Sequence, residues 1–310
     1  MKRKLQNYST GLKQNLQKRK VLNALFFIVA LLILAFSFLT LIILLFDLFS
    51  RGSSRVSYDF FFNFPSRLPE RAGILSAWVG SLCVMLVTAS VAIPLGIFSA
   101  IYLEMYAKKN WVSRLIEINI LNLAAIPSIT FGLMALGLFV YQFGFGQSIL
   151  TAGLTLGLLI LPLIIVATRE AIKTIPHSIH EAGYALGSTK WQLIQHHILP
   201  YSTGGILTGV IIALSRAIGE TAPLITIGAL TFIAFLPTPP VSGEFPFLSL
   251  QWIMDPFTVL PIQMFNWVSR PQEAFHVNAA ATGSVLLVLT LCLNAVAIYI
   301  RYRFRKKMSW

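Results

Sequence analysis

Six long apolar runs restrict this sequence to a membrane architecture. They lie at residues 21–49, 73–102, 112–141, 148–168, 202–236 and 277–300. A helix that crosses the hydrocarbon core of a bilayer needs about 20 mostly apolar residues, and each run reaches that length. Only 11% of all residues are charged, whereas an ordinary soluble domain has about 25%. The sequence therefore predicts an all-α membrane protein with six transmembrane helices.

Basic residues lie mainly on one side of the predicted membrane. Lys and Arg accumulate in the cytoplasmic segments of membrane proteins. If the N-terminus is inside, 18 of the 24 Lys and Arg residues fall in inner segments and 5 in outer segments. Both termini are therefore predicted to be cytoplasmic. Much of the net charge of +13 comes from residues 1–20 and 301–307, which suits contact with anionic headgroups rather than with nucleic acid.

The inner loop at 177–200 carries two signals for helix starts. Ser178 with Glu181, and Thr189 with Gln192, match the capping-box spacing. Gly187 lies between them, where a helix can end in a left-handed turn. The loop is therefore predicted to form helix, glycine break and helix at the membrane surface. On spacing alone, it is equally well a plain interfacial hairpin in which Glu181 serves only as a cap.

The same loop resembles the EAA loop of the permeases of ABC importers. The matching residues are Glu181, Ala182, Gly187, Ile198, Leu199 and Pro200. Gly183 replaces the second alanine of the pattern, which slightly lowers the helix propensity. In that family the loop forms a coupling helix that docks in a groove of a separate ATPase subunit. The resemblance thus implies an ATPase-coupling site at Glu181, Ala182, Leu186 and Gly187.

An exposed apolar stripe at Ala182, Ala185 and Leu186 suits this role, because a partner's groove can bury a short helix that a lone permease cannot. The sequence has no phosphate-binding loop of the form G-x-x-x-x-G-K-[ST]. ATP hydrolysis is therefore expected on another chain, with no catalytic residue and no cofactor here. No metal site is expected either, because carboxylate and cysteine ligands do not accompany the histidines His177, His180, His196 and His197.

Two opposite charges lie inside the fifth apolar run. Arg216 and Glu220 are four residues apart, so they are expected to share a helix face. An arginine at the bilayer centre costs about 2.5–3.5 kcal/mol on insertion scales, and pairing with a carboxylate offsets part of that. One interpretation is a buried ion pair that only fixes helix packing. The other is a site on the path of a polar solute.

An arginine beside a carboxylate can act as a filter for phosphate. The guanidinium fork pairs with tetrahedral oxyanions. A neighbouring carboxylate accepts a hydrogen bond from a protonated oxyanion and repels one without a proton. Phosphate keeps a proton at neutral pH, whereas sulfate does not. Glu220 can equally serve only to offset the charge of Arg216, so this remains a hypothesis at the sequence level.

Three stretches resemble the permeases of the Pst phosphate-import system. They are ALSRAIGETAPLI at 213–225, FTVLPIQMFNWVSRPQEAFH at 257–276, and AAIPSITFGL at 124–133. The last two resemble the A-type of the two Pst permeases, and Pro127 is expected to bend the third span. Sulfate and molybdate relatives continue differently from Thr221 onward. The resemblance covers about 70–300 and implies a PstA-type subunit with Arg216, Glu220 and Thr221 on the substrate path.

The outer loop at 237–276 is rich in proline and aromatic residues and carries little charge. These residues include Pro237, Pro239, Pro240, Phe245, Pro246, Trp252, Pro256, Pro261 and Trp267. One interpretation is an irregular cap that its aromatic side chains hold at the membrane interface. The other is a docking surface for an external phosphate-binding protein, and the two are compatible.

The resemblance implies the type I ABC importer permease fold in a multi-pass protein of the bacterial plasma (inner) membrane. Its expected partners are a PstC-type permease, two ATPase subunits, an external phosphate-binding protein and membrane lipid, but no nucleic acid. The expected divisions are a basic N-terminus at 1–20, the first helix and an external linker at 21–69, the permease domain at 70–302, and a basic C-terminus at 303–310.

Two other functions remain open from the sequence. One is a related ABC importer for another oxyanion, such as sulfate or molybdate. The other is an ion-coupled secondary transporter that uses Arg216 and Glu220 as a charge relay. A secondary transporter would leave the loop at 177–200 without a partner, and no inverted repeat relates 21–141 to 148–300. A membrane scaffold would leave the charge pair unexplained.

Overall fold

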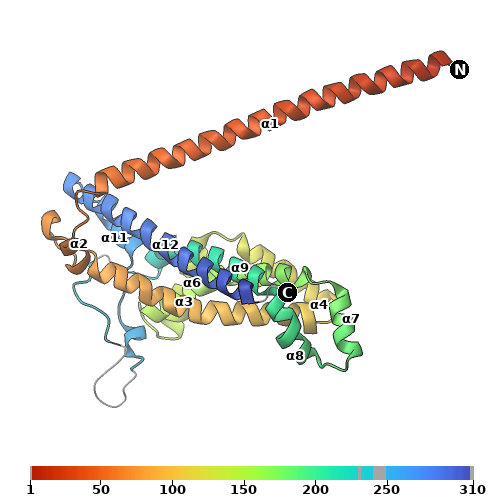
Figure 1. Cartoon of the computed structure of the whole chain (residues 1–310). Coiled ribbons are helices and arrows are strands. Elements are labelled where there is room, and N and C mark those ends of the chain that lie inside the picture. The colour runs from red at the N-terminus through yellow and green to blue at the C-terminus, as the bar shows by residue number, and fades with distance from the viewer. Residues whose placement is uncertain (1, 230–231, 240–248, 308–310) are drawn as a thin grey trace. The chain divides into compact units, whose positions relative to one another are not determined.

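The computed structural model describes residues 2–229, 232–239 and 249–307 (Figure 1). It divides into two compact units, Met1–Arg51 and Gly52–Trp310. Within the described ranges, five helices are long and apolar enough to cross a membrane, or six if one sharply bent pair counts as a single span. The regular elements described are all helical, and Ser148 and Pro256 form an isolated β-bridge. The predicted all-α membrane fold is confirmed.

The described residues contain seventeen helical segments. In order they are α1 (Lys2–Gly52), α2 (Tyr58–Phe62), η1 (Pro69–Arg71), α3 (Leu75–Ile101), η2 (Tyr102–Tyr106), α4 (Trp111–Ala124), α5 (Ser128–Ala135), η3 (Leu136–Gln142), α6 (Ile149–Lys173), α7 (His177–Ala185), α8 (Lys190–Leu193), η4 (Ile194–Ile198), α9 (Leu199–Gly219), α10 (Ala222–Thr226), η5 (Gln251–Met254), α11 (Leu260–Val268) and α12 (Glu273–Lys307). Four predicted spans, 21–49, 73–102, 148–168 and 277–300, correspond to α1, α3 with η2, α6 and α12.

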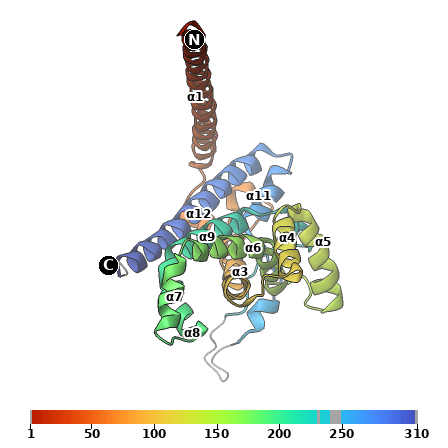
Figure 2. The same ribbon diagram turned by 90° about the vertical axis from the view of Figure 1, so that its right-hand side faces the viewer.

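Helix α6 forms the centre of the second unit. It packs against α3, α9 and α4 (Figure 2). Its buried face includes Leu156, Ile160 and Ile164. Small residues allow close approach, and the Thr88 hydroxyl of α3 donates a hydrogen bond to the Gly153 carbonyl of α6 at 3.2 Å. Such contacts replace the hydrophobic effect, which does not drive helices together in lipid.

The third predicted span, 112–141, is two helices rather than one. α4 and α5 meet at 104° around Pro127. Proline has no N–H to donate to the carbonyl four residues back, and its ring disfavours helical backbone before it. Pro127 itself is extended, with φ −55° and ψ 137°. The expected bend is thus confirmed, but the expectation of a single continuous helix is wrong.

The fifth predicted span, 202–236, begins close to the start of α9 at Leu199 but is wrong at its C-terminal end. A continuous helical stretch begins at Lys190 and ends at Gly219. Glu220 has extended backbone, with φ −77° and ψ 128°. Pro223 cannot donate to the carbonyl of Gly219, so α9 cannot continue through it. The chain resumes as the short helix α10.

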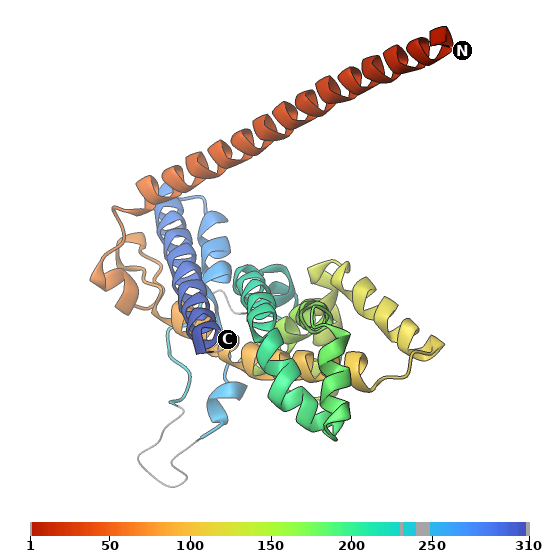
Figure 3. The ribbon, with the colours of Figure 1, turned by 45° about the vertical axis from the view of Figure 1, so that its right-hand side comes forward.

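The outer loop at 237–276 is more regular than the irregular cap expected from its composition. It contains α11, which packs against α12 (Figure 3). Trp267 of α11 is fully buried, with its ring 6.0 Å from Phe60 and 6.4 Å from Phe275. This tryptophan is therefore a core residue rather than an interface anchor. Pro240, Phe245 and Pro246 lie outside the described residues.

Candidate functional site

Arg216 and Glu220 form the predicted pair at the end of α9. Arg216 lies in the last turn of the helix, and Glu220 is the residue that ends it. Arg216 Nε and Glu220 Oε1 are 3.4 Å apart, and their side chains are 44% and 18% exposed. Arg216 therefore presents much of its guanidinium outside the chain. Its position also favours α9 directly, because cations stabilise the C-terminal turn of a helix.

The break after Arg216 leaves a polar side chain beside the pair. Thr221 is half-buried and separates Glu220 from α10. Its backbone carbonyl accepts hydrogen bonds from Leu224 and Ile225. Among the described residues, no hydrogen bond uses its hydroxyl, which is therefore available. The predicted path residues thus lie together where α9 ends, with Arg216 in its last turn and Glu220 and Thr221 in the break that follows.

Helix α10 is held by α5, which follows the break at Pro127. A Cβ on Gly132 of α5 would lie 2.7 Å from both Cα and the carbonyl oxygen of Pro223. Real Cβ atoms do not approach other atoms so closely, so only glycine fits at this contact. The two broken spans are therefore packed against each other just beyond the charge pair.

Two polar bridges join α9 to α12. The Ser215 hydroxyl lies 2.6 Å from Asn294 Oδ1, and Arg301 donates to the Thr208 hydroxyl at 2.8 Å. They tie one face of α9 to α12. A cleft of about 290 Å³ between α3, α9 and α12 is lined by Ser215 and otherwise mostly by apolar residues, and Arg216 is not among them. This cleft does not coincide with the charge pair.

The inner loop has the predicted order of helix, glycine break and helix. α7 ends at Leu186, and Gly187 adopts a left-handed conformation with φ +81°. The amides of Gly187 and Ser188 donate to the carbonyls of Tyr184 and Gly183 at 3.0 and 3.1 Å. This pattern is the Schellman motif, which satisfies the last carbonyls of a helix. The loop therefore has a defined turn.

One of the two predicted caps is correct. Thr189 and Gln192 form the reciprocal capping box at the start of α8. Ser178 does not cap α7, because that helix already begins at His177 after Pro176. Proline fixes a backbone angle that suits a helix start. The pattern around Ser178 was therefore a false match.

The predicted coupling residues lie on the open side of the loop. Glu181, Ala182 and Gly187 are exposed, and Leu186 is 87% exposed. Gly183 is buried, and a Cβ there would lie 2.6 Å from Leu193 Cδ1. Gly183, which stands where the EAA pattern has its second alanine, thus allows α7 to lie close to α8. These residues and the charge pair lie at opposite ends of the helical stretch Lys190–Gly219.

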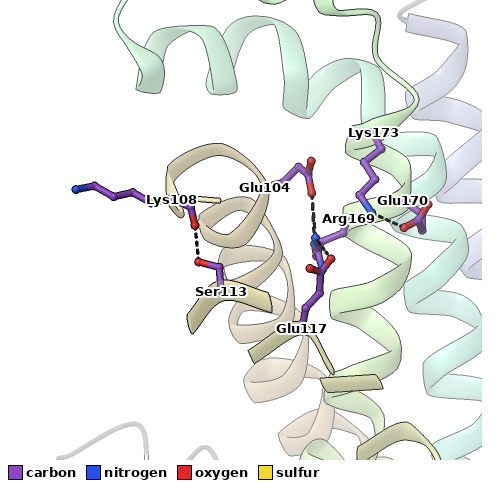
Figure 4. A network of polar contacts seen from close by, with 7 residues as sticks. All are labelled: Glu104, Lys108, Ser113, Glu117, Arg169, Glu170 and Lys173. Atoms are coloured by element: carbon purple, nitrogen blue, oxygen red, sulfur yellow. Dashed lines mark hydrogen bonds and ion pairs between the residues drawn. The ribbon is translucent and has the colours of Figure 1, made fainter. Parts of the chain in front are cut away.

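An ion cluster that was not predicted joins three helical segments at the end of the spans that is predicted to face the cytoplasm. Arg169 of α6 forms ion pairs with Glu104 of η2, at 3.3 Å, and with Glu117 of α4 (Figure 4). Beside it, Lys173 Nζ lies 2.9 Å from Glu170 Oε1. Glu104, Glu117 and Arg169 all lie near span ends that were predicted on the same side. That shared position was the available signal for the cluster.

The described residues contain no group of three His, Cys, Asp or Glu side chains that could hold a metal ion. Cys83 and Cys292 are free thiols. The imidazoles of His177 and His180 lie 5.7 Å apart at the start of α7. What these described regions offer chemically is therefore a partly exposed charge pair and a loop with an uncovered apolar side chain.

Comparison with known proteins supports this description. Residues 92–310 match the family model for the binding-protein-dependent transport system inner membrane component. The chain is 31% identical to the phosphate transport system permease protein PstA of Yersinia pestis, over 93% of this chain and 92% of the relative. It is 29% identical to PstA 1 of Mycobacterium tuberculosis (strain CDC 1551 / Oshkosh), over 76% of this chain and 73% of the relative.

The fold is also similar to that of a solved transporter. A chain from an inward-facing structure of the MetNI methionine ABC transporter aligns with a TM-score of 0.50 and 16% identity. The alignment covers 74% of this chain and 92% of that chain. With the family match and the relatives, the helical architecture and its inner loop lead to one conclusion. The chain belongs to the family of binding-protein-dependent transport system inner membrane components, the permease subunits of ABC importers.

Proposed function

We propose that this chain is the A-type permease subunit of an ATP-driven phosphate importer. The observation that carries the proposal is the half-exposed Arg216, held beside Glu220 where α9 breaks. The phosphate specificity is supported by the relatives in Yersinia pestis and Mycobacterium tuberculosis, whose names are those of phosphate transport permeases. The chain itself is a membrane component and not an enzyme, and ATP is hydrolysed on a separate subunit.

The charge pair can bind phosphate without placing an unpaired arginine in the hydrocarbon of the membrane. Arg216 offers a planar fork to two oxygens of the anion. Glu220, which is the more buried partner, accepts a hydrogen bond from the proton that phosphate retains. The unpaired hydroxyl of Thr221 can donate to a third oxygen. Because Arg216 is open on one side, a second permease subunit completes the wall of the path in this proposal.

The inner loop transmits ATPase movement in this proposal. Leu186 is an apolar side chain that the chain itself leaves uncovered, and it stands at the turn between α7 and α8. A groove on an ATPase subunit would bury it. α8 and η4 are anchored in the chain by the fully buried Leu193, Ile194 and Ile198. The full proposed assembly has a PstC-type permease, two ATPase subunits and an external phosphate-binding protein.

Uptake by the reconstituted complex tests the role of Arg216. We expect Arg216→Gln to lower phosphate uptake into proteoliposomes by about tenfold or more, because a hydrogen-bonded charge on the path is lost. Arg216→Lys should also transport poorly, since a single ammonium cannot replace the planar fork. Uptake is measured with radiolabelled phosphate, ATP and saturating external binding protein.

The matched control is Arg19→Gln, which removes the same charge from an exposed position of the N-terminal segment and should transport normally. Each variant is first checked for assembly with its partner subunits by co-purification. If the assembled Arg216→Gln complex transports phosphate at the normal rate, Arg216 is a packing residue and the proposed path is wrong. A complex that transports sulfate or molybdate instead of phosphate would reassign the substrate.

A further inference from the structure

A polar cavity of about 500 Å³ lies near the ends of η2, α4 and α6, away from the charge pair of α9. This end of the spans carries the excess of Lys and Arg and is predicted to face the cytoplasm. Five basic residues line the cavity, namely Lys108, Lys109, Arg114, Arg169 and Lys173. Glu104 and Glu117 are its acidic residues. The lining therefore carries an excess of positive charge.

The ion pairs leave that excess uncompensated. Both acidic residues are already engaged by Arg169 (Figure 4). Among the described residues, Lys108, Lys109 and Arg114 form no ion pair. In Figure 4 the Lys108 ammonium points away from the Arg169 cluster. Arg169 with its two glutamates keeps one net negative charge, and the three cations without an ion pair outnumber it, so the cavity as a whole favours an anionic ligand.

The backbone around these cations is held in one conformation. The Asn110 side chain caps α4 by accepting from the Ser113 amide at 3.0 Å. The Ser113 hydroxyl donates to the Lys108 carbonyl at 2.7 Å. The turn that carries Lys108 and Lys109 is therefore tied to the first turn of α4. Holding the turn before a ligand arrives reduces the entropy lost on binding.

Helix α4 lines the cavity with Trp111, Ser113, Arg114 and Glu117 and exposes apolar side chains beside it. None of the residues of α4 is buried within the chain. Trp111 is 75% exposed and Leu115 is 50% exposed. Tryptophan prefers the level of the lipid headgroups, at the boundary between hydrocarbon and water. A ligand of this cavity therefore meets cations at its polar end and an apolar helix face beside it.

We propose that this cavity binds the phosphate headgroup of an anionic phospholipid of the inner leaflet. Free phosphate shares the headgroup's charge, but the apolar face of α4 favours a ligand that has acyl chains. Basic pockets between membrane helices on the cytoplasmic side are suited to anionic headgroups. A volume of about 500 Å³ is within the range of small-molecule sites. The site is separate from the transport path and does not depend on the transported substrate.

Native mass spectrometry of the delipidated complex tests the proposal. The complex is titrated with phosphatidylglycerol or with phosphatidylcholine that has the same acyl chains. We expect phosphatidylglycerol to bind at least about tenfold more tightly. Each basic residue near an anionic group contributes roughly fivefold in affinity, so the triple variant Lys108→Gln/Lys109→Gln/Arg114→Gln should lose more than about tenfold.

Two control variants separate a specific site from net charge and from misfolding. Arg51→Gln/Arg67→Gln/Arg71→Gln removes the same charge from exposed positions outside the two basic terminal segments and should keep the preference. Lys108→Arg/Lys109→Arg preserves the charge and should bind phosphatidylglycerol normally. Equal binding of the two lipids by the unaltered complex would overturn the proposal. So would equal losses in the two triple variants.

Two further results would identify a different occupant and also overturn the lipid assignment. In the first, inorganic phosphate at millimolar concentration displaces phosphatidylglycerol, which would make the cavity a site for free anions. In the second, the triple variant binds phosphatidylglycerol normally but no longer co-purifies with the ATPase, which would make it a protein interface. Neither result depends on whether the complex transports phosphate.

Discussion

The two members of the charge pair differ in exposure, and we propose different tasks for them. Glu220 is 18% exposed and Arg216 is 44% exposed. Glu220→Gln keeps the side-chain volume but removes the negative charge. We expect phosphate uptake to fall by about tenfold, since a hydrogen bond to a charged acceptor is lost. Uptake of sulfate, which has no proton to donate, should not fall in parallel.

The selectivity test needs vesicles in which the external binding protein does not choose the ion. A variant complex that works without the binding protein is therefore used, and ATPase stimulation is recorded for phosphate, arsenate and sulfate. Arsenate retains a proton and should follow phosphate. Glu70→Gln, at an exposed outer position, is the matched control. An equal drop for all three ions would leave Glu220 as a charge partner only.

Residue spacing predicted the contacts that lie close in sequence. Arg216 and Glu220 do pair, and Thr189 does cap α8. The cluster around Arg169 was not predicted, because the partners of Arg169 are far away along the chain, at Glu104 and Glu117. Such pairs depend on which helix ends meet, and local spacing carries no information about that. The roles of the path and coupling residues remain predictions.

At the level of elements, the turn at Gly187 is a sensitive point of the inner loop. A Cβ at this position meets no atom within 4 Å, so the only obstacle to substitution is the backbone angle of +81°. A β-branched residue in this conformation costs about 1–2 kcal/mol or more. We expect Gly187→Val to reduce ATP-driven uptake by roughly 5–30-fold while the protein still inserts in the membrane.

Gly187→Asn provides the control for this turn, because asparagine tolerates left-handed backbone. It should retain most of the uptake. ATPase activity and co-purification of the ATPase are measured for both variants. Normal uptake by Gly187→Val would show that the turn plays no part in coupling.

The contact between α5 and α10 makes a second prediction about elements. Gly132→Ala should destabilise the protein by about 1–3 kcal/mol, the usual range for overpacking, because the methyl group would collide with Pro223. Gly137→Ala is the control, since a Cβ there meets no atom within 4 Å. Thermal unfolding of the purified protein in detergent, followed by circular dichroism, compares the two. A normal midpoint for Gly132→Ala would contradict the close packing.

Apolar runs predicted where the helices lie but not where they break. A membrane helix can keep a proline inside it, as α3 does at Pro94 and α6 does at Pro162. Pro127 directly precedes the short helix α5, and Pro223 lies in the short helix α10. These two helices pack against each other, and this packing distinguishes Pro127 and Pro223 from Pro94 and Pro162. Helix α11 was not predicted either, because the burial of its Trp267 depends on residues that are distant in the sequence, such as Phe60.

For the whole molecule, the bent pair α4 and α5 decides the topology. If it crosses the membrane as one span, there are six spans and both termini face the same side. If it is a re-entrant loop, there are five spans and the termini face opposite sides. We expect six, in agreement with the charge distribution.

Labelling of single cysteines in intact cells tests this topology, in a background with Cys83 and Cys292 replaced. A membrane-impermeant maleimide should label Arg67→Cys, which is at an exposed position in a segment predicted to be outside. It should not label Lys18→Cys or Arg303→Cys until the cells are opened. Labelling of only one of the two terminal cysteines from outside would establish five spans.

The contact at Gly132 has a mechanical consequence for transport. Two helices that touch without room for a methyl group are expected to move together. The non-helical residues Glu220 and Thr221 are the expected point of bending between these helices and α9. A tilt of the bent pair would swing Glu220 toward or away from Arg216. We expect spin labels on α5 and α10 to keep a constant separation through the ATPase cycle, while the separation between α9 and α10 alternates between two values.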